Sequence, residues 1–231
     1  MHVLLFDTET TGLPNTGLIN TDHMNKWPYI VQFSYIFYDM DANKILKSSD
    51  TIIKIPAHIK IPLECTNIHG ITNEMCETQG VPFIQVFTEF MTYFNKANWV
   101  VAHNLNFDLN MLKVEVLREI NHCGERLTRS AKRNYEILNE CLYTQTEKLY
   151  CTMFNTKKLC NIRRINKLGH EYIKVPKLIE LHETLFGTSP KNLHNSFNDV
   201  IVLLRCYYKL HKNDDLMNID EEFKTYIEQL L

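Results

Sequence analysis

The stretch HVLLFDTETTGLP, at residues 2–14, is the most informative part of the sequence for the fold. Its apolar first half predicts a short buried strand over residues 2–7, and the segment TETTGLP is typical of a break after it. Asp7 and Glu9 are two positions apart, so on an extended segment their side chains project to the same side. Two carboxylates there repel each other unless a cation is present, and carboxylate oxygens suit Mg²⁺ or Mn²⁺. The alternative is a pair of solvated turn residues or helix caps.

Further along the chain, strand patterns come first and then alternate with helix patterns. Strands are predicted at residues 29–38, 46–55, 99–102 and 149–153. Helices are predicted at residues 83–94, 104–120, 125–147, 176–186, 196–211 and 219–231. This order predicts an α/β fold in which helices cover the faces of a single sheet, with no internal repeat and no linker between domains.

Composition narrows the class of protein. The chain has 231 residues, of which 45% are hydrophobic and 23% charged, which excludes a disordered or low-complexity chain. The net charge of −2 excludes nucleic-acid binding through overall positive charge, although a local basic track remains open. The seven cysteines include no C-x-x-C pair, which favours reduced thiols. We expect no membrane span and no signal peptide, and hence an intracellular protein, cytoplasmic or nuclear.

Two later segments place polar groups beside predicted helices. In VVAHNLNFDLNML, residues 100–112, a buried strand ends and Asp108 follows about one helical turn later. Such a position lies at the strand ends where α/β sheets bind ligands, although an acid in a first helical turn also complements the helix dipole. In HNSFND, residues 194–199, His194 precedes a helix that carries Asp199. A histidine near metal-binding acids is a candidate general base, whereas a lone histidine is more often structural.

Taken in order, the motifs D-x-E, H-N-x-x-F-D and H-x-x-x-x-D resemble those of the DEDDh exonucleases, also called the DnaQ-like or proofreading epsilon-subunit type. NIHGIT at residues 67–72, CTM at 151–153 and PKLIELHETLFG at 176–187 resemble further segments of these proteins. The resemblance spans residues 3 to about 211. It implies a ribonuclease H-like fold, a five-stranded mixed sheet flanked by helices, in a single exonuclease domain over residues 1–231. A C-terminal surface helix would occupy residues 218–231, approximately.

The resemblance also implies a mechanism. Asp7 would bridge two Mg²⁺ ions, for which Mn²⁺ would substitute. Glu9 and Asp199 would hold the ion on the side of the nucleophile, and Asp108 would hold the other. His194 would take the proton from the attacking water, and the product would be a nucleoside 5′-monophosphate released from a 3′ end.

Substrate-binding residues follow from the same resemblance. Thr10, Leu13 and Pro14 would line the terminal nucleotide, with the Thr10 N–H meeting the 3′ hydroxyl and Leu13 wedged against the base. His69 would face the same nucleotide, and Asn104 would lie near the site. The alternative is that residues 12–14 form a simple turn with one buried leucine.

A basic stretch occupies residues 157–177, with seven Lys or Arg residues against one acid, Glu171. It fits either nucleic-acid contact or a solvated face. We therefore expect a nucleic-acid partner, the 3′ end of single-stranded DNA or a frayed duplex, with RNA an alternative. No membrane partner is expected, a polymerase partner is possible, and the oligomeric state is open.

Three functions are compatible with these motifs. The first is a metal-dependent 3′–5′ exonuclease acting on DNA. The second is a 3′–5′ exoribonuclease of the ribonuclease T type. The third is a non-catalytic nucleic-acid-binding module on an exonuclease fold, against which the intact acids and His194 argue.

Overall fold

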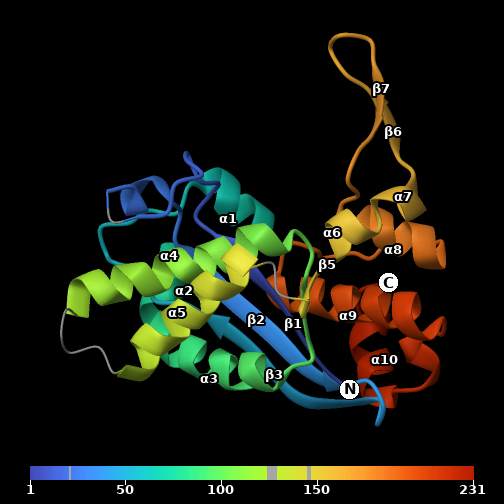
Figure 1. Cartoon of the computed structure of the whole chain (residues 1–231), viewed down its shortest axis with the longest axis horizontal. Coiled ribbons are helices and arrows are strands. Elements are labelled where there is room, and N and C mark those ends of the chain that lie inside the picture. Colours follow the sequence, from blue (N-terminus) through green and yellow to red (C-terminus); the bar gives the residue numbers. More distant parts are fainter. Residues whose placement is uncertain (21, 124–128, 145–146) are drawn as a thin grey trace.

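The computed structural model describes all residues except 21, 124–128 and 145–146. Its centre is a five-stranded sheet in the order β3-β2-β1-β4-β5 (Figure 1). The strands are β1 (His2–Thr10), β2 (Ile30–Asp39), β3 (Lys44–Ile52), β4 (Trp99–Ala102) and β5 (Leu149–Cys151). β1 pairs antiparallel with β2 and parallel with β4, which confirms the predicted mixed sheet.

Strand β1 lies in the middle of the sheet because its first half is apolar on both faces. Leu4 and Phe6 belong to one core cluster, whereas Val3 and Leu5 belong to the other, and all four are fully buried. The strand also runs further than the sequence predicts. It ends at Thr10 and not at Asp7, because residues 7–10 continue to pair with β2. Asp7 and Glu9 therefore lie on the strand itself, beyond its last pair with β4 at Leu5 and Val101.

Helices cover both faces of the sheet (Figure 1). One face packs against α3 (Phe83–Lys96), α4 (Leu105–Cys123) and α5 (Arg129–Thr144). The other packs against α8 (Leu178–Phe186), α9 (Ser196–Lys212) and α10 (Glu221–Glu228). The six predicted helices are present, although part of the range 125–147 lies outside the described residues. The predicted C-terminal surface helix corresponds to α10, which buries Phe223 and Ile227 in the second cluster and exposes Glu221, Glu222 and Glu228. Within the described residues, every helix is too short or too polar to cross a membrane.

Several short elements were not predicted. Helices α1 (Leu63–His69) and α2 (Asn73–Thr78) lie between β3 and α3, and short 3₁₀ helices occur at Met24–Lys26 and Leu216–Asn218. The predicted strand 149–153 ends at Cys151, where α6 (Thr152–Asn155) and α7 (Lys157–Cys160) follow, and a hairpin of β6 (Arg163–Ile165) and β7 (Glu171–Ile173) comes next. These elements are too short for hydrophobic periodicity to distinguish them.

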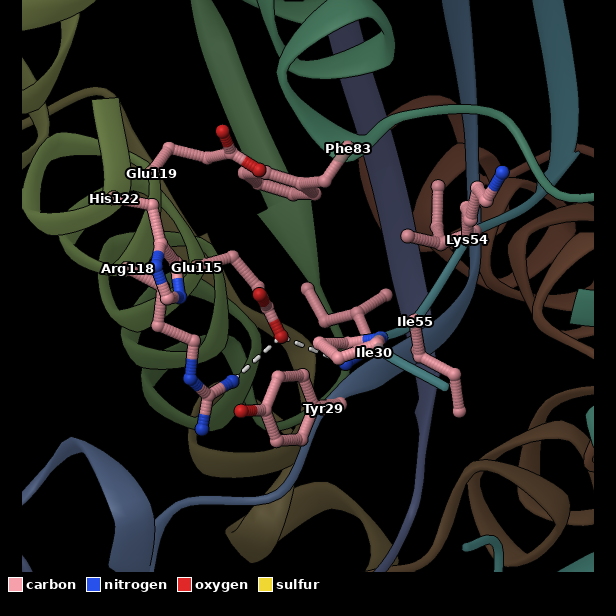
Figure 2. A pocket seen from close by; sticks show the side chains of 11 residues that line it. Tyr29, Ile30, Lys54, Ile55, Phe83, Glu115, Arg118, Glu119 and His122 are labelled. Carbon is pink, nitrogen blue, oxygen red and sulfur yellow. Dashed lines mark hydrogen bonds and ion pairs between the residues drawn. The ribbon is translucent and has the colours of Figure 1, made fainter. Parts of the chain in front are cut away.

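A buried ion pair fixes α4 to the chain that enters β2 (Figure 2). The Arg118 guanidinium lies 2.7 Å from Glu115 Oε1, and the same oxygen accepts the backbone N–H of Ile30 at 3.0 Å. The guanidinium also donates to three backbone carbonyls, those of Met24, Trp27 and Pro28. The ring of Tyr29 lies 3.7 Å from the guanidinium carbon and lines a cavity of about 230 Å³. Side chains therefore hold this connection in place where it has little regular structure.

We expect Arg118→Ala to lower the free energy of unfolding by about 3–5 kcal/mol, the usual effect of breaking a buried ion pair. Burial raises the pKa of Glu115 to about 7, and Arg118 opposes that shift. Without Arg118 the folded-state pKa rises further above its unfolded value, so the loss should be larger at pH 8 than at pH 6. Urea unfolding at both pH values measures it, with the exposed Arg133→Ala on α5 as the control. Equal midpoints for Arg118→Ala and wild type would contradict this role.

Candidate active site

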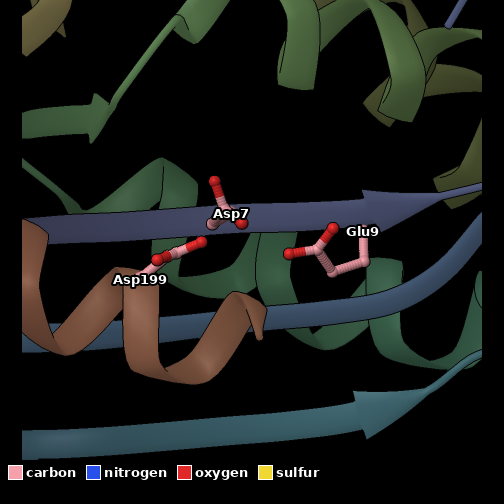
Figure 3. Close-up of side chains that lie close together, drawn as sticks. All are labelled: Asp7, Glu9 and Asp199. Carbon is pink, nitrogen blue, oxygen red and sulfur yellow. The ribbon is translucent and has the colours of Figure 1, made fainter. Parts of the chain in front are cut away.

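Three carboxylates meet where β1 passes the start of α9 (Figure 3). Asp7 and Glu9 project from the same side of β1, as their spacing predicts, and Asp199 approaches them from the first turn of α9. Each of the three carboxylates contributes one oxygen, and these three oxygens all lie within 4.8 Å of one another. Asp199 follows Asp7 by almost the whole chain, so tertiary packing brings this group together.

The first turn of α9 is pinned to the sheet by polar contacts. Ser196, which is fully buried, places its Oγ 2.6 Å from Ser34 Oγ on β2, and its backbone N–H donates to Gln32 Oε1 at 3.1 Å. Asn195 caps the helix by accepting two N–H groups of the first turn. These contacts fix the position of Asp199 relative to β1.

The fourth predicted acid, Asp108, comes from α4 and is buried. Its Oδ1 accepts hydrogen bonds from the Thr8 hydroxyl at 2.8 Å and the Thr8 N–H at 3.2 Å. Asp108 is not one of the three mutually close acids, but it lines the same cavity as they do. The negative charge of Asp108 also contributes to raising the pKa of Asp7. The structure thus brings all four predicted acids around one space.

The electrostatics of this cluster are those of crowded carboxylates that are wholly or partly buried. Burial raises the pKa of Asp7 well above its usual value, and the charges of Asp108, Asp199 and Glu9 raise it further. Burial and neighbouring Asp199 raise the pKa of Glu9 to about 8, and burial also raises the pKa values of Asp108 and Asp199. Asp199 Oδ1 is buried and, among the described residues, has no hydrogen-bond partner. A set of oxygen donors with excess negative charge fits a hard divalent cation.

Thermal stability should report this cation site without any enzymatic assay. Because the folded-state pKa values are raised, the unfolding free energy conferred by these acids falls as pH rises through about 8. A bound cation offsets the repulsion and competes with protons, so Mg²⁺ should raise the melting temperature more at pH 8 than at pH 6. Asp199→Asn should reduce the shift, whereas the exposed Glu222→Gln on α10 should keep it. A Mg²⁺-induced shift unaffected by Asp199→Asn would contradict this site.

His194 lies at the mouth of the same cavity. Its side chain is exposed, and its backbone N–H donates to Asp199 Oδ2 at 3.2 Å. The residue has φ +68°, a left-handed conformation that is uncommon for residues other than glycine. The Asn198 side chain supports this loop by donating to the carbonyl of Asn192 at 2.8 Å. His194 and Asp199 are therefore held together by backbone geometry before the helix begins.

The cavity has a volume of about 770 Å³, and it includes some but not all of the predicted substrate-binding residues. Leu13 lines it and is 79% exposed, so the alternative of a buried turn leucine was wrong. Asn104 also lines it, whereas Thr10, Pro14 and His69 do not. Thr10 is buried, with its hydroxyl donating to the carbonyl of Gly12.

His69 does not line the cavity but lies next to Thr10. Burial lowers its pKa, and the neighbouring backbone of Thr10 partly offsets that shift. Its Nδ1 accepts the N–H of Ile71 at 3.0 Å, so Nε2 carries the proton, and Nε2 has no hydrogen-bond partner among the described residues. The structure therefore leaves a buried donor close to the predicted site of the terminal nucleotide.

The cavity is also lined by residues to which the sequence assigned no role, namely His103, Phe107, Met153 and residues 174–178. Burial lowers the pKa of His103 to about 4, so the ring is neutral at pH 7. Its Nε2 donates to the carbonyl of Pro176 at 3.0 Å, and its Nδ1 accepts the Thr152 hydroxyl at 2.9 Å. His103 thus joins the ends of β4 and β5 to the wall. His103 and Phe107 belong to the motif H-N-x-x-F-D, and the other residues lie in or next to CTM and PKL, but these motifs carried no role for them.

Known proteins resemble this chain over most of its length. Residues 4–207 match the family model of the RNase T family, whose description is exonuclease. The chain is 23% identical over 234 residues to the DNA polymerase III subunit epsilon of Buchnera aphidicola subsp. Acyrthosiphon pisum (strain APS), covering 96% of this chain and 81% of that protein.

Solved structures show the same fold. Exonuclease I from Methylocaldum szegediense superposes with a TM-score of 0.57 at 15% identity, over 92% of this chain and 41% of that chain. E. coli Exonuclease I in complex with a dT13 oligonucleotide superposes with a TM-score of 0.58 at 14% identity, over 92% of this chain and 42% of that chain. The chain thus spans about two fifths of the Exonuclease I chains, and the likeness extends to the sheet and its flanking helices.

Proposed function

Since the chain belongs to the RNase T exonuclease family, we propose that it is a metal-dependent 3′–5′ exonuclease that hydrolyses the terminal phosphodiester bond of DNA. The observation that carries the proposal is the meeting of Asp7, Glu9 and Asp199 within 4.8 Å, in a cavity that Asp108 and His194 also line. DNA is favoured because Exonuclease I structures hold dT13 and dA16 oligonucleotides. The polymerase III epsilon relative makes a polymerase partner part of the same proposal.

The acids would hold two Mg²⁺ ions, or Mn²⁺ in their place. The charges of Glu9, Asp199 and Asp108 all act on Asp7, so Asp7 would be the shared ligand, with Glu9 and Asp199 completing one site and Asp108 the other. When bound, such ions stabilise the attacking and leaving oxygens of an in-line displacement. The hydrogen bonds from Thr8 orient Asp108, and the contacts of Ser196 orient Asp199.

His194 would act as the general base. Its backbone bond to Asp199 holds the residue at the cavity that the acids line, and its exposure would let a proton pass from the ring to solvent. Water attacks phosphorus, His194 accepts its proton, and the bond from phosphorus to the 3′ oxygen breaks. The shortened strand keeps a 3′ hydroxyl after taking up a proton, and the other product is a nucleoside 5′-monophosphate.

The terminal nucleotide would bind between Leu13 and the strand end. Leu13 exposes its apolar side chain at the cavity edge, where a base could cover it. The register shift between Glu9 and Thr10 is a strand irregularity of the kind found next to active sites, and the Thr10 N–H there would meet the 3′ hydroxyl. Pro14 and His69 would complete this side, with the His69 Nε2–H as a hydrogen-bond donor, and Asn104, which lines the cavity, would lie near the nucleotide.

Removal of divalent ions should abolish the activity. With Mg²⁺, 5′-labelled single-stranded DNA should give a ladder shortened from its 3′ end. EDTA and Asp199→Ala should each eliminate the ladder. The exposed Glu222→Gln on α10 is the matched control and should leave it intact.

The choice of substrates separates the alternatives. A ladder on matched RNA alone would assign the protein to the ribonuclease T type, whereas preference for a duplex with a 3′ mismatch would indicate editing. Tight binding of DNA without hydrolysis in either Mg²⁺ or Mn²⁺ would overturn the proposal in favour of a non-catalytic module.

A further inference from the structure

A hairpin formed by β6 and β7 stands away from the rest of the molecule (Figure 1). The residues of β6, and all but Ile173 of β7, are exposed. At its base, the Lys174 N–H donates to the Ile162 carbonyl at 2.9 Å, and residues 174–178 then form part of the cavity wall. The ion pair between Lys174 and Glu180 at 2.8 Å ties this base to α8. The hairpin is therefore a projection of the rim of the active-site cavity.

The shape of the hairpin is specified by its own sequence. Asn166 Oδ1 accepts the N–H groups of Leu168 and His170 at 2.9 and 3.0 Å. Gly169 has φ +83°, which glycine adopts without strain, and its N–H donates to the Asn166 carbonyl at 3.0 Å. The tip thus keeps its form without packing on the body. At about 3.3 Å per residue, the extended part of the arm spans about 13 Å from Ile162 to Asn166, where the turn begins.

The two faces of the hairpin differ in charge. Directly opposite residues share a face of an antiparallel pair, and Arg164 lies opposite Tyr172. On the other face, Arg163 forms an ion pair with Glu171 at 3.3 Å. The Arg164 guanidinium donates to the carbonyl of Arg163 and, among the described residues, forms no ion pair. One face therefore presents an uncompensated cation beside an aromatic ring that is 47% exposed.

We propose that this hairpin is a nucleic-acid-binding arm that holds the strand whose 3′ end enters the cavity. Arg164 contacts a phosphate, Tyr172 stacks on a base, and Lys167 at the tip contacts a phosphate further along the strand. The chain as a whole carries a net charge of −2, so positive charge on the arm is local. Such contacts are independent of base sequence. The inference rests on the proposed function for the direction of the strand, but the binding itself can be tested without turnover.

The test combines binding with hydrolysis of a small substrate. Arg164→Ala and Tyr172→Ala are compared with Arg163→Ala, which removes the same charge from the other face. Binding of a labelled single-stranded oligothymidylate, long enough to span the arm, is measured by fluorescence anisotropy in EDTA. Hydrolysis of the p-nitrophenyl ester of thymidine 5′-monophosphate is measured in Mg²⁺. Each variant changes an exposed side chain, so melting temperatures should equal that of wild type.

Tyr172→Ala should weaken binding of the oligonucleotide about 5- to 150-fold, the range of one base–aromatic stacking contact. Arg164→Ala should weaken it and lower the slope of log affinity against log salt by about one. Arg163→Ala should have a smaller effect, and none of the three should change hydrolysis of the small ester.

The opposite results are distinct from one another. Unchanged binding in both Arg164→Ala and Tyr172→Ala would overturn the proposal that the hairpin binds nucleic acid. The exposed Leu168 and Ile165 would then favour a protein partner for the hairpin. Equal losses of oligonucleotide affinity in Arg163→Ala and Arg164→Ala would overturn the assignment of binding to the face that carries Arg164 and Tyr172. If wild type hydrolyses neither the ester nor the oligonucleotide, the proposed exonuclease fails, while the anisotropy comparison still decides the arm.

Discussion

Asp7→Asn is expected to abolish exonuclease activity almost completely while the protein stays folded. The charges of Asp108, Asp199 and Glu9 all raise the pKa of Asp7, which is why we propose it as the ligand that both ions would share. Its replacement would remove that ligand. Transition-state charge stabilisation by metal ions is worth several kcal/mol, and each 1.36 kcal/mol is tenfold in rate. The loss should therefore be about 10³-fold or more in kcat, measured as initial rates on 5′-labelled DNA.

Stability distinguishes this effect from misfolding. Asp7→Asn replaces a carboxylate whose pKa is raised by burial, so its ionisation opposes folding at high pH. In EDTA at pH 8 the variant should melt at or above the temperature of wild type, and it should lose most of the Mg²⁺-induced shift. Glu222→Gln should retain both activity and shift. Rapid Mg²⁺-dependent turnover by Asp7→Asn would disprove the shared-ligand assignment.

The second large effect is expected for His194→Ala, with a loss of about 10²–10⁴-fold in kcat, the usual contribution of general acid–base catalysis. The side chain is exposed and its structural contact to Asp199 is made by the backbone N–H, so its removal should leave the fold intact. The Mg²⁺-induced rise in melting temperature should persist, because the acids are unchanged. Kinetics under saturating DNA measure the loss directly.

A proton-transfer role for His194 predicts more than a slow enzyme. Added imidazole should restore part of the rate of His194→Ala, because it supplies a base in the space left by the side chain. The exposed His58→Ala serves as a control and should behave like wild type. If His194→Ala changes only KM, the histidine positions the substrate and some other group accepts the proton.

Local sequence patterns predicted the sheet and the main helices well. The apolar run of β1 is buried on both faces, and the apolar stripe of α3 packs on the sheet. Such periodicities reflect which side chains must leave water, so they are readable before any fold is known. In α10, Phe223 and Ile227 are four positions apart and form the buried face, while the acidic residues lie on the exposed face.

Other features had no local signal. The hydrogen bonds of Arg118 to the chain that enters β2 join segments that are distant in sequence, and so does the hydrogen bond of His103 to Pro176. The cavity rim likewise combines distant segments. The β6–β7 hairpin buries almost nothing, so it lacks the apolar alternation by which strands are recognised. Its turn chemistry, with asparagine and glycine at the tip, was the one signal available.

The residue order alone established which side chains share a face of a strand, because the alternation of side chains has a fixed period of two. Asp7 and Glu9 were placed side by side on that basis. Folding established that Asp199, Asp108 and His194 join them, since the packing of α9 and α4 on the sheet places these groups in one cavity. Folding also raised the pKa values of the acids, because burial and mutual repulsion exist only once the four carboxylates have been brought together.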